Sequence, residues 1–473
     1  MSAMTTLTGE TVRVDGELDA LATDLAGTLI RDDEPGYDQA RALWNAMTPR
    51  RPAAIVRCAT TDDVRRVVRF AAERDLLLAV RGGGHNVAGT AGADGGIVVD
   101  LSDMNDVEVD PATRRARAGG GATFADLDAA TQEHGLAAPG GVVSKTGIGG
   151  LTLSGGIGWL RRKHGLTCDN LVAATLVAAD GTVHQVDEER DPELLWGLRG
   201  GGGNFGVATE LTYQLHPVGP EVFAAIVVHP ADHAEEALRA YRDWTADLPD
   251  EVSSIVECGS VPEGEGFPEE HWGEPCVILA ACAATDLARG EALVQPLRDL
   301  DAPIADLSAP VPYVEMQQLF DADYPDGLRY YWRSLHLPGL SDEVIGRTVG
   351  WLHSRPSPLT TLDLWHLGGA MSRVAPEATA YGDRSAPFLL GIEANWTDPA
   401  DDDANIDWTR ACVEAFEPLS TGREYLNFPG FLEDGDRTLR AAHGEANHAR
   451  LRELKRRMDP ENRFRLHQNI PPA

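Results

Sequence analysis

Lysine and cysteine are scarce in this chain of 473 residues, and it contains no long apolar run. Only three lysines occur, so arginine supplies nearly all of the 41 basic residues, which face 74 acidic ones. The resulting net charge of -33 argues against nucleic acid or an anionic membrane surface as a partner. An acidic protein poor in lysine fits a high-salt cytoplasm, but a GC-rich genome also favours arginine, so both interpretations stay open.

The six cysteines are scattered along the chain, at Cys58, Cys168, Cys258, Cys276, Cys282 and Cys412. They form no CxxC pair and no metal-ligand spacing, so we expect mostly reduced thiols and no bound metal. Residues 1–16 are polar and lack the apolar core of a signal peptide, and no segment approaches the length of a membrane span. We therefore expect a cytoplasmic protein.

A glycine-rich loop at 81–89 is the most informative segment. It reads Arg81-Gly82-Gly83-Gly84-His85-Asn86-Val87-Ala88-Gly89 and lies between apolar runs that predict strands at 76–80 and 97–101. Adjacent glycines let main-chain N–H groups converge on an anion, because no Cβ holds the ligand away. The loop predicts an anion cradle that carries one histidine. The alternative is a tight turn between strands whose histidine is only solvated.

Two further glycine clusters follow this loop. The segment 140–158 is so rich in glycine that its backbone is expected to pass very close to a flat or anionic ligand. Gly201-x-Gly203-x-x-Gly206 fits the dinucleotide-binding pattern, but that pattern works only where a helix follows the glycines. Here an alternating strand begins at Val207, which argues against a Rossmann site. No Gly-Lys-Ser/Thr occurs, so a phosphate-loop NTPase is excluded.

A chain of 473 residues with a hydrophobic content of 43% is expected to fold into two or three domain-sized units with large hydrophobic cores. Apolar residues between 60 and 72 recur at helical spacing, whereas 107–118 and 171–186 resemble hairpins. After Pro217 the glycine clusters become rare, and longer helices and strands alternate. We expect an α+β fold, with later helices at 231–248, 286–300 and 342–353, and later strands at 277–283, 362–367 and 388–397.

The order of the motifs resembles that of one known family. Besides the three glycine clusters, the chain carries Asp94-Gly95-Gly96-Ile97-Val98-Val99-Asp100-Leu101-Ser102, His164-Gly165-Leu166-Thr167-Cys168-Asp169-Asn170, and Asp459-Pro460-Glu461-Asn462-Arg463-Phe464 with Gln468-Asn469-Ile470. This order resembles the FAD-linked oxidases of the vanillyl-alcohol oxidase and p-cresol methylhydroxylase type, in the berberine-bridge-enzyme-like branch. The resemblance extends from about residue 36 to 472.

The resemblance implies an FAD-binding domain of the PCMH type with two subdomains at 1–218, its core from about residue 48. It implies a substrate domain at 219–424, with an antiparallel sheet covered by helices, and a C-terminal segment at 425–473 that returns to the FAD domain. His85 would carry an 8α-histidyl bond to the flavin, and Cys168 a second, 6-S-cysteinyl bond, unless Cys168 is only a small buried thiol. The other residues implied to bind the cofactor are Arg81, Gly82, Gly83, Gly84, Asn86, Gly89, Thr146, Gly147, Gly150, Leu151, Gly155, Gly158, Trp159, Val207, Asn427 and Asn469.

The proton acceptor is predicted on the sheet that covers the flavin. Glu393 stands in an otherwise apolar strand, where a buried carboxylate is costly without a partner or a task. Tyr425 matches a segment in which relatives carry a Tyr-x-Asn-Tyr pattern, but Phe428 replaces the second tyrosine and favours Glu393 as the base. Further pocket residues expected by position, although each is equally compatible with a core role, are Tyr330, Tyr331, Trp332, Trp365 and His366.

The sequence thus predicts an oxidoreductase that removes a hydride from a carbon bearing O–H or N–H, with reoxidation by O2 or another acceptor. A sugar or other hydroxyl substrate is the first expectation, and a cyclic amine is the alternative within enzymes. A flavin-binding protein without turnover is the alternative from another class. We expect a small-molecule substrate and neither nucleic acid nor membrane as a partner.

Overall fold

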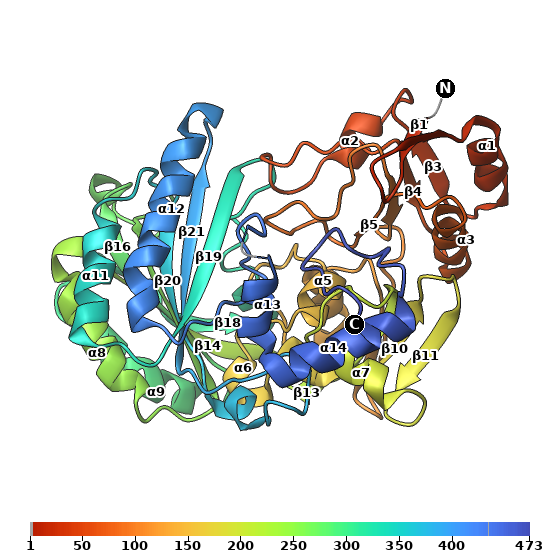
Figure 1. Cartoon of the computed structure of the whole chain (residues 1–473). Coiled ribbons are helices and arrows are strands. Elements are labelled where there is room, and N and C mark those ends of the chain that lie inside the picture. Colours follow the sequence, from red (N-terminus) through yellow and green to blue (C-terminus); the bar gives the residue numbers. More distant parts are fainter. Residues whose placement is uncertain (1–2, 434) are drawn as a thin grey trace.

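The computed structural model describes residues 3–433 and 435–473 and arranges them in two units (Figure 1). The first unit begins with a four-stranded sheet in the order β3-β4-β6-β5, in which β4 and β5 run parallel to β6. The helix α3 (Thr61–Ala72) starts at a capping box on Thr60 and buries Val64, Val67 and Val68, as its spacing predicts. The other elements of this part are β1 (Ala3–Thr5), β2 (Thr11–Arg13), α1 (Asp15–Asp24), β3 (Thr28–Arg31), α2 (Tyr37–Arg41), β4 (Ala54–Arg57), β5 (Leu78–Arg81) and β6 (Ile97–Asp100).

A second, five-stranded antiparallel sheet completes the first unit, in the order β11-β10-β12-β8-β7. Both predicted hairpins are present, as β7 (Val107–Asp110) with β8 (Arg115–Gly119) and β10 (Leu171–Val177) with β11 (Val183–Asp187). Gly206 leads directly into β12 (Val207–Gln214), which confirms that the glycines at 201–206 do not open a helix. The remaining elements are α4 (Phe124–Gln132), β9 (Leu136–Ala137), α5 (Ile148–Leu153), α6 (Arg161–His164), η1 (Thr167–Asn170), α7 (Pro192–Leu198) and β13 (His216–Pro217).

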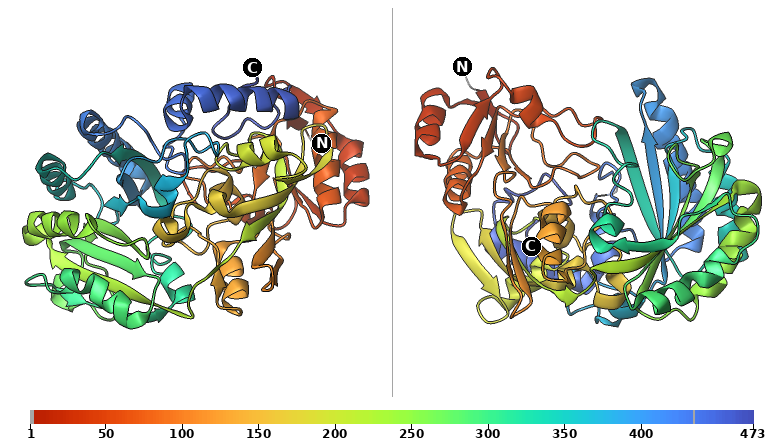
Figure 2. Two further views of the ribbon diagram at one scale, coloured as in Figure 1. Left: turned by 90° about the horizontal axis from the view of Figure 1, so that it is seen from below. Right: turned by 180° about the vertical axis from the view of Figure 1, so that it is seen from behind.

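The second unit is one eight-stranded antiparallel sheet with helices on its outer face, as expected. Its strands follow the order β17-β14-β16-β15-β20-β21-β19, and β18 pairs with β14. Figure 2 shows the helices on the side away from the first unit, so the inner face of the sheet is turned toward that unit. The strands are β14 (Glu221–Pro230), β15 (Val252–Ser260), β16 (Pro275–Ala283), β17 (Ala305–Asp306), β18 (Ala309–Pro312), β19 (Arg329–Leu337), β20 (Thr361–His366) and β21 (Phe388–Trp396). The outer helices are α8 (Ala234–Thr245), α9 (Leu287–Arg298), α11 (Asp342–Leu352) and α12 (Asp402–Phe416), whereas the short α10 (Tyr313–Gln317) packs against α4 of the first unit. Short 3-10 turns lie at η2 (Ala231–His233), η3 (Glu269–His271), η4 (Gly369–Arg373), η5 (Pro399–Asp401) and η6 (Glu417–Leu419).

The C-terminal segment crosses back to the first unit through α13 (Gly435–His443) and α14 (Glu445–Met458). Leu451 and Leu454 of α14 join the core beneath the five-stranded sheet. The ammonium of Lys455 is fully buried and donates to the carboxylate of Asp459 at 2.7 Å and to the carbonyls of Asn204 and Phe464. These bonds fix the tail against the loop at 201–206. Among the described helices, none combines the length and the apolarity needed to cross a membrane.

Candidate active site

A cavity of about 260 Å³ lies between the inner face of the large sheet and the glycine-rich loops of the first unit. Its walls come from segments that are far apart in the sequence, because the two units and the C-terminal tail all contribute to it. The main lining segments are 78–86, 141–157, 203–208, 425–428 and 464–468, together with sheet residues between 255 and 393 and the loop residues Phe320 and Tyr324.

Two glycine loops pack backbone against backbone along one wall of this cavity. A Cβ on Gly83 would lie 2.5 Å from the amide nitrogen of Gly147, and one on Gly147 would lie 2.3 Å from that of Gly83. Gly84 adopts a φ of +69°, in the left-handed region that glycine enters at little cost. Side chains are therefore excluded at this crossing, and the main chain itself forms the wall.

His85 projects from this loop and lines the cavity. Its ring stacks on Trp44 with a centroid distance of 4.1 Å, and Trp44 in turn stacks on Tyr330 at 3.6 Å. Burial lowers the pKa of His85 to about 4, so the imidazole is neutral at pH 7. Its Nε2 is buried and has no hydrogen-bond partner within the described chain. The structure thus holds an oriented, neutral imidazole whose nitrogen faces no protein partner.

The tail brings further unsatisfied groups to the same cavity. His467 lines it with both ring nitrogens buried and unpaired among the described residues, and burial lowers its pKa to about 4. Arg465 also lines it, and its Nε is likewise buried without a partner there. Buried polar groups in native proteins almost always have partners, so such a cluster indicates a polar ligand. Neither Arg465 nor His467 was predicted from the sequence.

Carboxyl groups mark the end of the cavity formed by the large sheet. Glu393 of β21 and Asp363 of β20 line it, and each is at most 4% exposed. Burial raises the pKa of Glu393 to about 7, against hydrogen bonds with Tyr324 and Asp363 that lower it. Burial and the neighbouring Glu393 raise the pKa of Asp363 well above its ordinary value. Glu393 therefore takes up and releases a proton near neutral pH.

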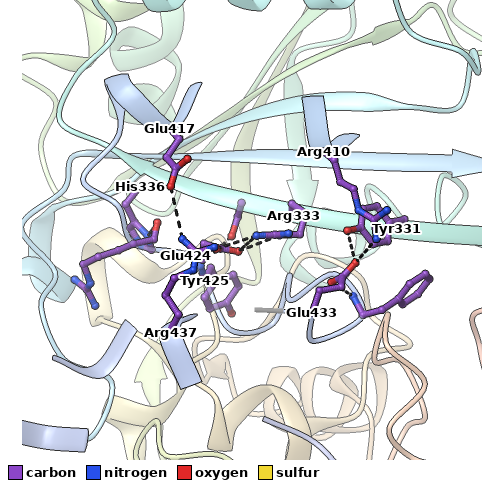
Figure 3. Close-up of polar contacts among 12 residues, drawn as sticks. Tyr331, Arg333, His336, Arg410, Glu417, Glu424, Tyr425, Glu433 and Arg437 are labelled. Atoms are coloured by element: carbon purple, nitrogen blue, oxygen red, sulfur yellow. Dashed lines mark hydrogen bonds and ion pairs between the residues drawn. The ribbon is translucent and has the colours of Figure 1, made fainter. Parts of the chain in front are cut away.

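The segment 424–428 forms the adjoining wall, and an ion pair and a hydrogen bond hold its neighbourhood to β19 (Figure 3). Arg333 of β19 donates two hydrogen bonds of 3.0 Å to the carboxylate of Glu424. Farther along, Glu433 accepts hydrogen bonds from Tyr331 at 2.6 Å and from Arg410 at 2.9 Å. Tyr425, Asn427 and Phe428 are thereby presented to the cavity.

Tyr425 is oriented by two hydrogen bonds to its hydroxyl oxygen. The oxygen accepts from the amide of Ile157 at 3.1 Å and from the side chain of Asn427 at 2.8 Å. Burial raises the pKa of Tyr425 to about 12, so it is a neutral phenol at pH 7. With both lone pairs engaged, its O–H is free to donate, which suits a positioning role better than that of a base.

Replacing Arg333 by methionine is expected to lower the free energy of unfolding by about 3 kcal/mol, because it removes the positive charge and the two hydrogen bonds that Arg333 gives to the carboxylate of Glu424, whose side chain is 10% exposed. Urea unfolding measures this change. The matched control is Arg410→Met, whose side chain is 48% exposed in its pair with Glu433 and is expected to cost about 1 kcal/mol or less. Equal losses in the two variants would contradict the role of the Arg333 pair.

Comparison with known proteins places these features in one family. Residues 52–187 match the FAD binding domain model, and residues 424–471 match the model for berberine and berberine-like proteins. An FAD-linked oxidoreductase of Dictyostelium discoideum is 30% identical over 95% of both chains. The (R)-6-hydroxynicotine oxidase of Paenarthrobacter nicotinovorans is 32% identical over 96% of this chain and 98% of its own.

The chain belongs to the berberine-like FAD-linked oxidoreductases. The fold agrees, since the crystal structure of 6-hydroxy-D-nicotine oxidase from Arthrobacter nicotinovorans superposes with a TM-score of 0.86 at 30% identity, covering 95% of this chain and 99% of that one. The expected α+β architecture, with its FAD-binding part and its substrate sheet, is thus confirmed.

An FAD fits the cavity of this berberine-like protein. Because the wall is glycine backbone without side chains, a ligand can approach it closely. The buried nitrogens of His85, Arg465 and His467 that have no partner among the described residues could form hydrogen bonds with such a ligand. Of the residues predicted to bind the cofactor, those that line the cavity are Gly82, Gly83, Gly84, His85, Asn86, Thr146, Gly147, Gly150, Leu151 and Asn427. Gly203 and Gly206 also line it, although their segment is no Rossmann motif.

Other predicted cofactor residues support the walls from behind and do not line the cavity. Arg81 donates to the carbonyl of Ala40 at 2.6 Å, and a Cβ on Gly158 would lie 1.8 Å from the carbonyl oxygen of Gly140. The remaining predicted residues outside the lining are Gly89, Gly155, Trp159, Val207 and Asn469, together with the pocket candidates Tyr330, Tyr331 and His366. Trp332 and Trp365, in contrast, do line it.

Cys168, the residue predicted to form a second bond to the flavin, does not line the cavity either. It lies in η1, fully buried in a core cluster with Trp159, Tyr381 and Tyr425, and it is not among the lining residues. Burial and the carboxylate of Asp169, which its thiol faces at 3.8 Å, raise the pKa of Cys168 above its ordinary value. The thiol therefore stays protonated, and the geometry favours the alternative of a small buried thiol.

Proposed function

We propose that this protein is an FAD-dependent oxidoreductase that removes a hydride from a carbon bearing O–H or N–H in a small molecule. One observation carries the proposal: His85 and Glu393 line the same cavity from opposite units, one as a neutral imidazole and the other as a carboxyl that ionises near pH 7. The first group suits attachment of a cofactor and the second suits proton transfer.

FAD, when bound, supplies the acceptor for the hydride and passes the electrons on to O2 or another acceptor. The residues proposed to hold it are the glycines of 82–84 and 147–150, Asn427, Arg465 and His467. His85 is proposed to carry the covalent bond, and we propose no second bond at Cys168, which lies outside the cavity lining. A single bond already fixes the ring against the substrate and removes the entropy of finding that pose.

Glu393 and Tyr425, on the other side of the cavity from His85, are proposed to have different roles toward the substrate. Glu393 accepts the proton that leaves the substrate O–H or N–H while the hydride departs from carbon. Tyr425 keeps its own proton and donates a hydrogen bond that orients the substrate. The buried carboxyl groups also argue against a flavin-binding protein without turnover. Burying them costs free energy, and a cavity that only held the cofactor would have no use for them.

Anaerobic mixing of the purified protein with alcohols, sugars and amines tests this function. Bleaching of the flavin absorption by at least one class, and its return on admission of air or an artificial acceptor, is the expected result. A colourless protein, or a yellow one that no donor of either class reduces, would contradict the proposal.

A further inference from the structure

The sheet end of the cavity is made of aromatic, aliphatic and carboxyl side chains. The inner face of the sheet contributes Ile255, Trp332, Asp363, Trp365, Leu389 and Glu393 to the lining. Phe320, Tyr324 and Phe428 cover the same space from neighbouring loops. Its polar character therefore rests on two carboxyl groups, the hydroxyls of Tyr324 and Tyr425, and the indole N–H of Trp365, because the indole N–H of Trp332 donates to Asn395.

The two carboxyl groups converge because of their strand register. Asp363 pairs with Gly391 across β20 and β21, and Glu393 lies two residues beyond Gly391 on the same face. A Cβ on Gly391 would lie 2.9 Å from Oε1 of Glu393 and 3.5 Å from both Nε1 of Trp365 and a ring carbon of Phe428. Gly391 thus leaves a small space in which a carboxyl group, an indole and a phenyl ring meet.

Oxygens of both carboxyl groups lack partners in this space. Oδ1 of Asp363 and Oε1 of Glu393 are buried, and neither has a hydrogen-bond partner within the described chain. Nε1 of Trp365 is buried and unpaired in the same way. Burying such groups without partners costs free energy that a bound ligand can return.

A third carboxyl group makes this part of the molecule still more acidic. Glu257 of β15 pairs with Asp363 in the register and lies on the same face of the sheet, beside the lining residues. The nearby Arg355 directs its guanidinium to the carbonyls of Gly259 and Thr360 and does not line the cavity. Along the described cavity wall there is no lysine, and the single arginine is Arg465 in the tail beside the first unit. The sheet end therefore gathers carboxyl groups without a protein cation among them, and a bound cation would favour their ionised form.

The aromatic rings around the carboxyl groups suit the same kind of ligand. Trp332 makes edge-to-face contacts with Phe428 at 5.2 Å and with Tyr324 at 5.1 Å, so rings enclose the space from several sides. Aromatic faces attract ammonium groups, most strongly where water is excluded. An oligosaccharide would instead bury many hydroxyls against rings and aliphatic groups that cannot pair with them.

We propose, on the basis of the function proposed above, that the substrate is a compact organic cation, a protonated amine, whose nitrogen binds Asp363 and Glu393 at the sheet end of the cavity. The nitrogen gives one proton to the carboxylate of Glu393. The carbon next to nitrogen then loses a hydride, which the flavin accepts, and the nitrogen lone pair forms the double bond of an iminium product. Water can hydrolyse that product after release to a carbonyl compound and a smaller amine.

Binding of two compounds of equal shape and unequal charge tests this inference. Phenyltrimethylammonium and tert-butylbenzene are titrated into the purified holoenzyme, and the change in the flavin absorption spectrum is followed. The cation cannot lose a proton from nitrogen, so it binds without turnover. We expect it to bind at least about tenfold more tightly than its neutral analogue. Asp363→Asn should remove most of that preference, whereas Asp38→Asn, at a side chain 79% exposed on α2, should retain it.

The affinities of the wild-type protein for the two compounds test the inference even if a variant folds poorly. Equal affinities, or tighter binding of tert-butylbenzene, would overturn the inference, and so would bleaching of the flavin by cellobiose but not by 1-methylpyrrolidine or other amines. A protein without flavin would contradict the proposed function instead, and calorimetric titration of the same two compounds would still report the preference for charge.

Discussion

Replacing His85 by alanine is expected to move the yellow colour from the pellet to the supernatant when the protein is precipitated with acid. The wild-type imidazole is neutral, buried and without a partner at Nε2, so it can bond to the flavin, and alanine offers no nucleophile in its place. Any FAD that the glycine loops still bind is then held by noncovalent contacts alone. Absorbance of the two fractions, with the mass of the peptide that contains residue 85, measures the change from nearly complete attachment to none.

The controls use the thiol that the family resemblance suggested as a second attachment point. Cys168→Ser and Cys168→Ala are expected to leave the colour in the pellet and the flavin spectrum unchanged, because Cys168 does not line the cavity. Colour retained in the pellet of the His85→Ala variant would show a second bond and contradict the single attachment. A flavin mass on the peptide that contains Cys168 would show where that bond lies.

The cofactor wall could be predicted from the sequence because its chemistry is local. Three consecutive glycines directly before one histidine show, within nine residues, that the backbone must approach a neighbour closely. The strands predicted on either side show where in the sheet this loop lies. Glu393 was also visible, as one charge within an apolar strand. The second attachment, at Cys168, stays a prediction of the family resemblance: its thiol is buried in a core cluster that also contains Tyr425, and it does not line the cavity.

The other wall depends on register, which the sequence does not reveal. Asp363 and Glu393 meet only because β20 and β21 pair as they do, and a shift by one residue would turn one carboxyl to the other face. The strands β14, β15 and β19 were not predicted. In β15 and β19 buried polar residues such as Glu257 and Arg333 interrupt the apolar run that made β16 and β21 recognisable. Arg465 and His467 were missed for a similar reason: only the fold of the tail brings them to the cavity.

Replacing Glu393 by glutamine is expected to lower the rate constant for anaerobic flavin reduction by about 10²-fold or more, because the amide cannot accept the substrate proton. The pH dependence of kcat/KM that Glu393 causes in the wild type should be lost in this variant. Burial raises the pKa of Glu393 to about 7, so the active carboxylate form grows as pH rises, and kcat/KM of the wild type should rise through about pH 7 and then level off. Besides burial, the groups that influence the pKa of Glu393 are Tyr324, Asp363 of the adjacent strand β20 and Glu257 of β15 beyond it.

Glu393→Gln distinguishes a loss of proton transfer from a loss of packing, because glutamine has nearly the same shape as glutamate and fills the same space beside Gly391. Glu393→Asp should restore part of the rate and keep a rising pH limb, because a carboxylate remains within the cavity. Glu315→Gln, the same change at an exposed side chain on α10, should leave both rate and limb as in the wild type. A Glu393→Gln variant that keeps the wild-type limb would assign that limb to another group, and the remaining carboxyl in the lining, Asp363, would then be the proton acceptor.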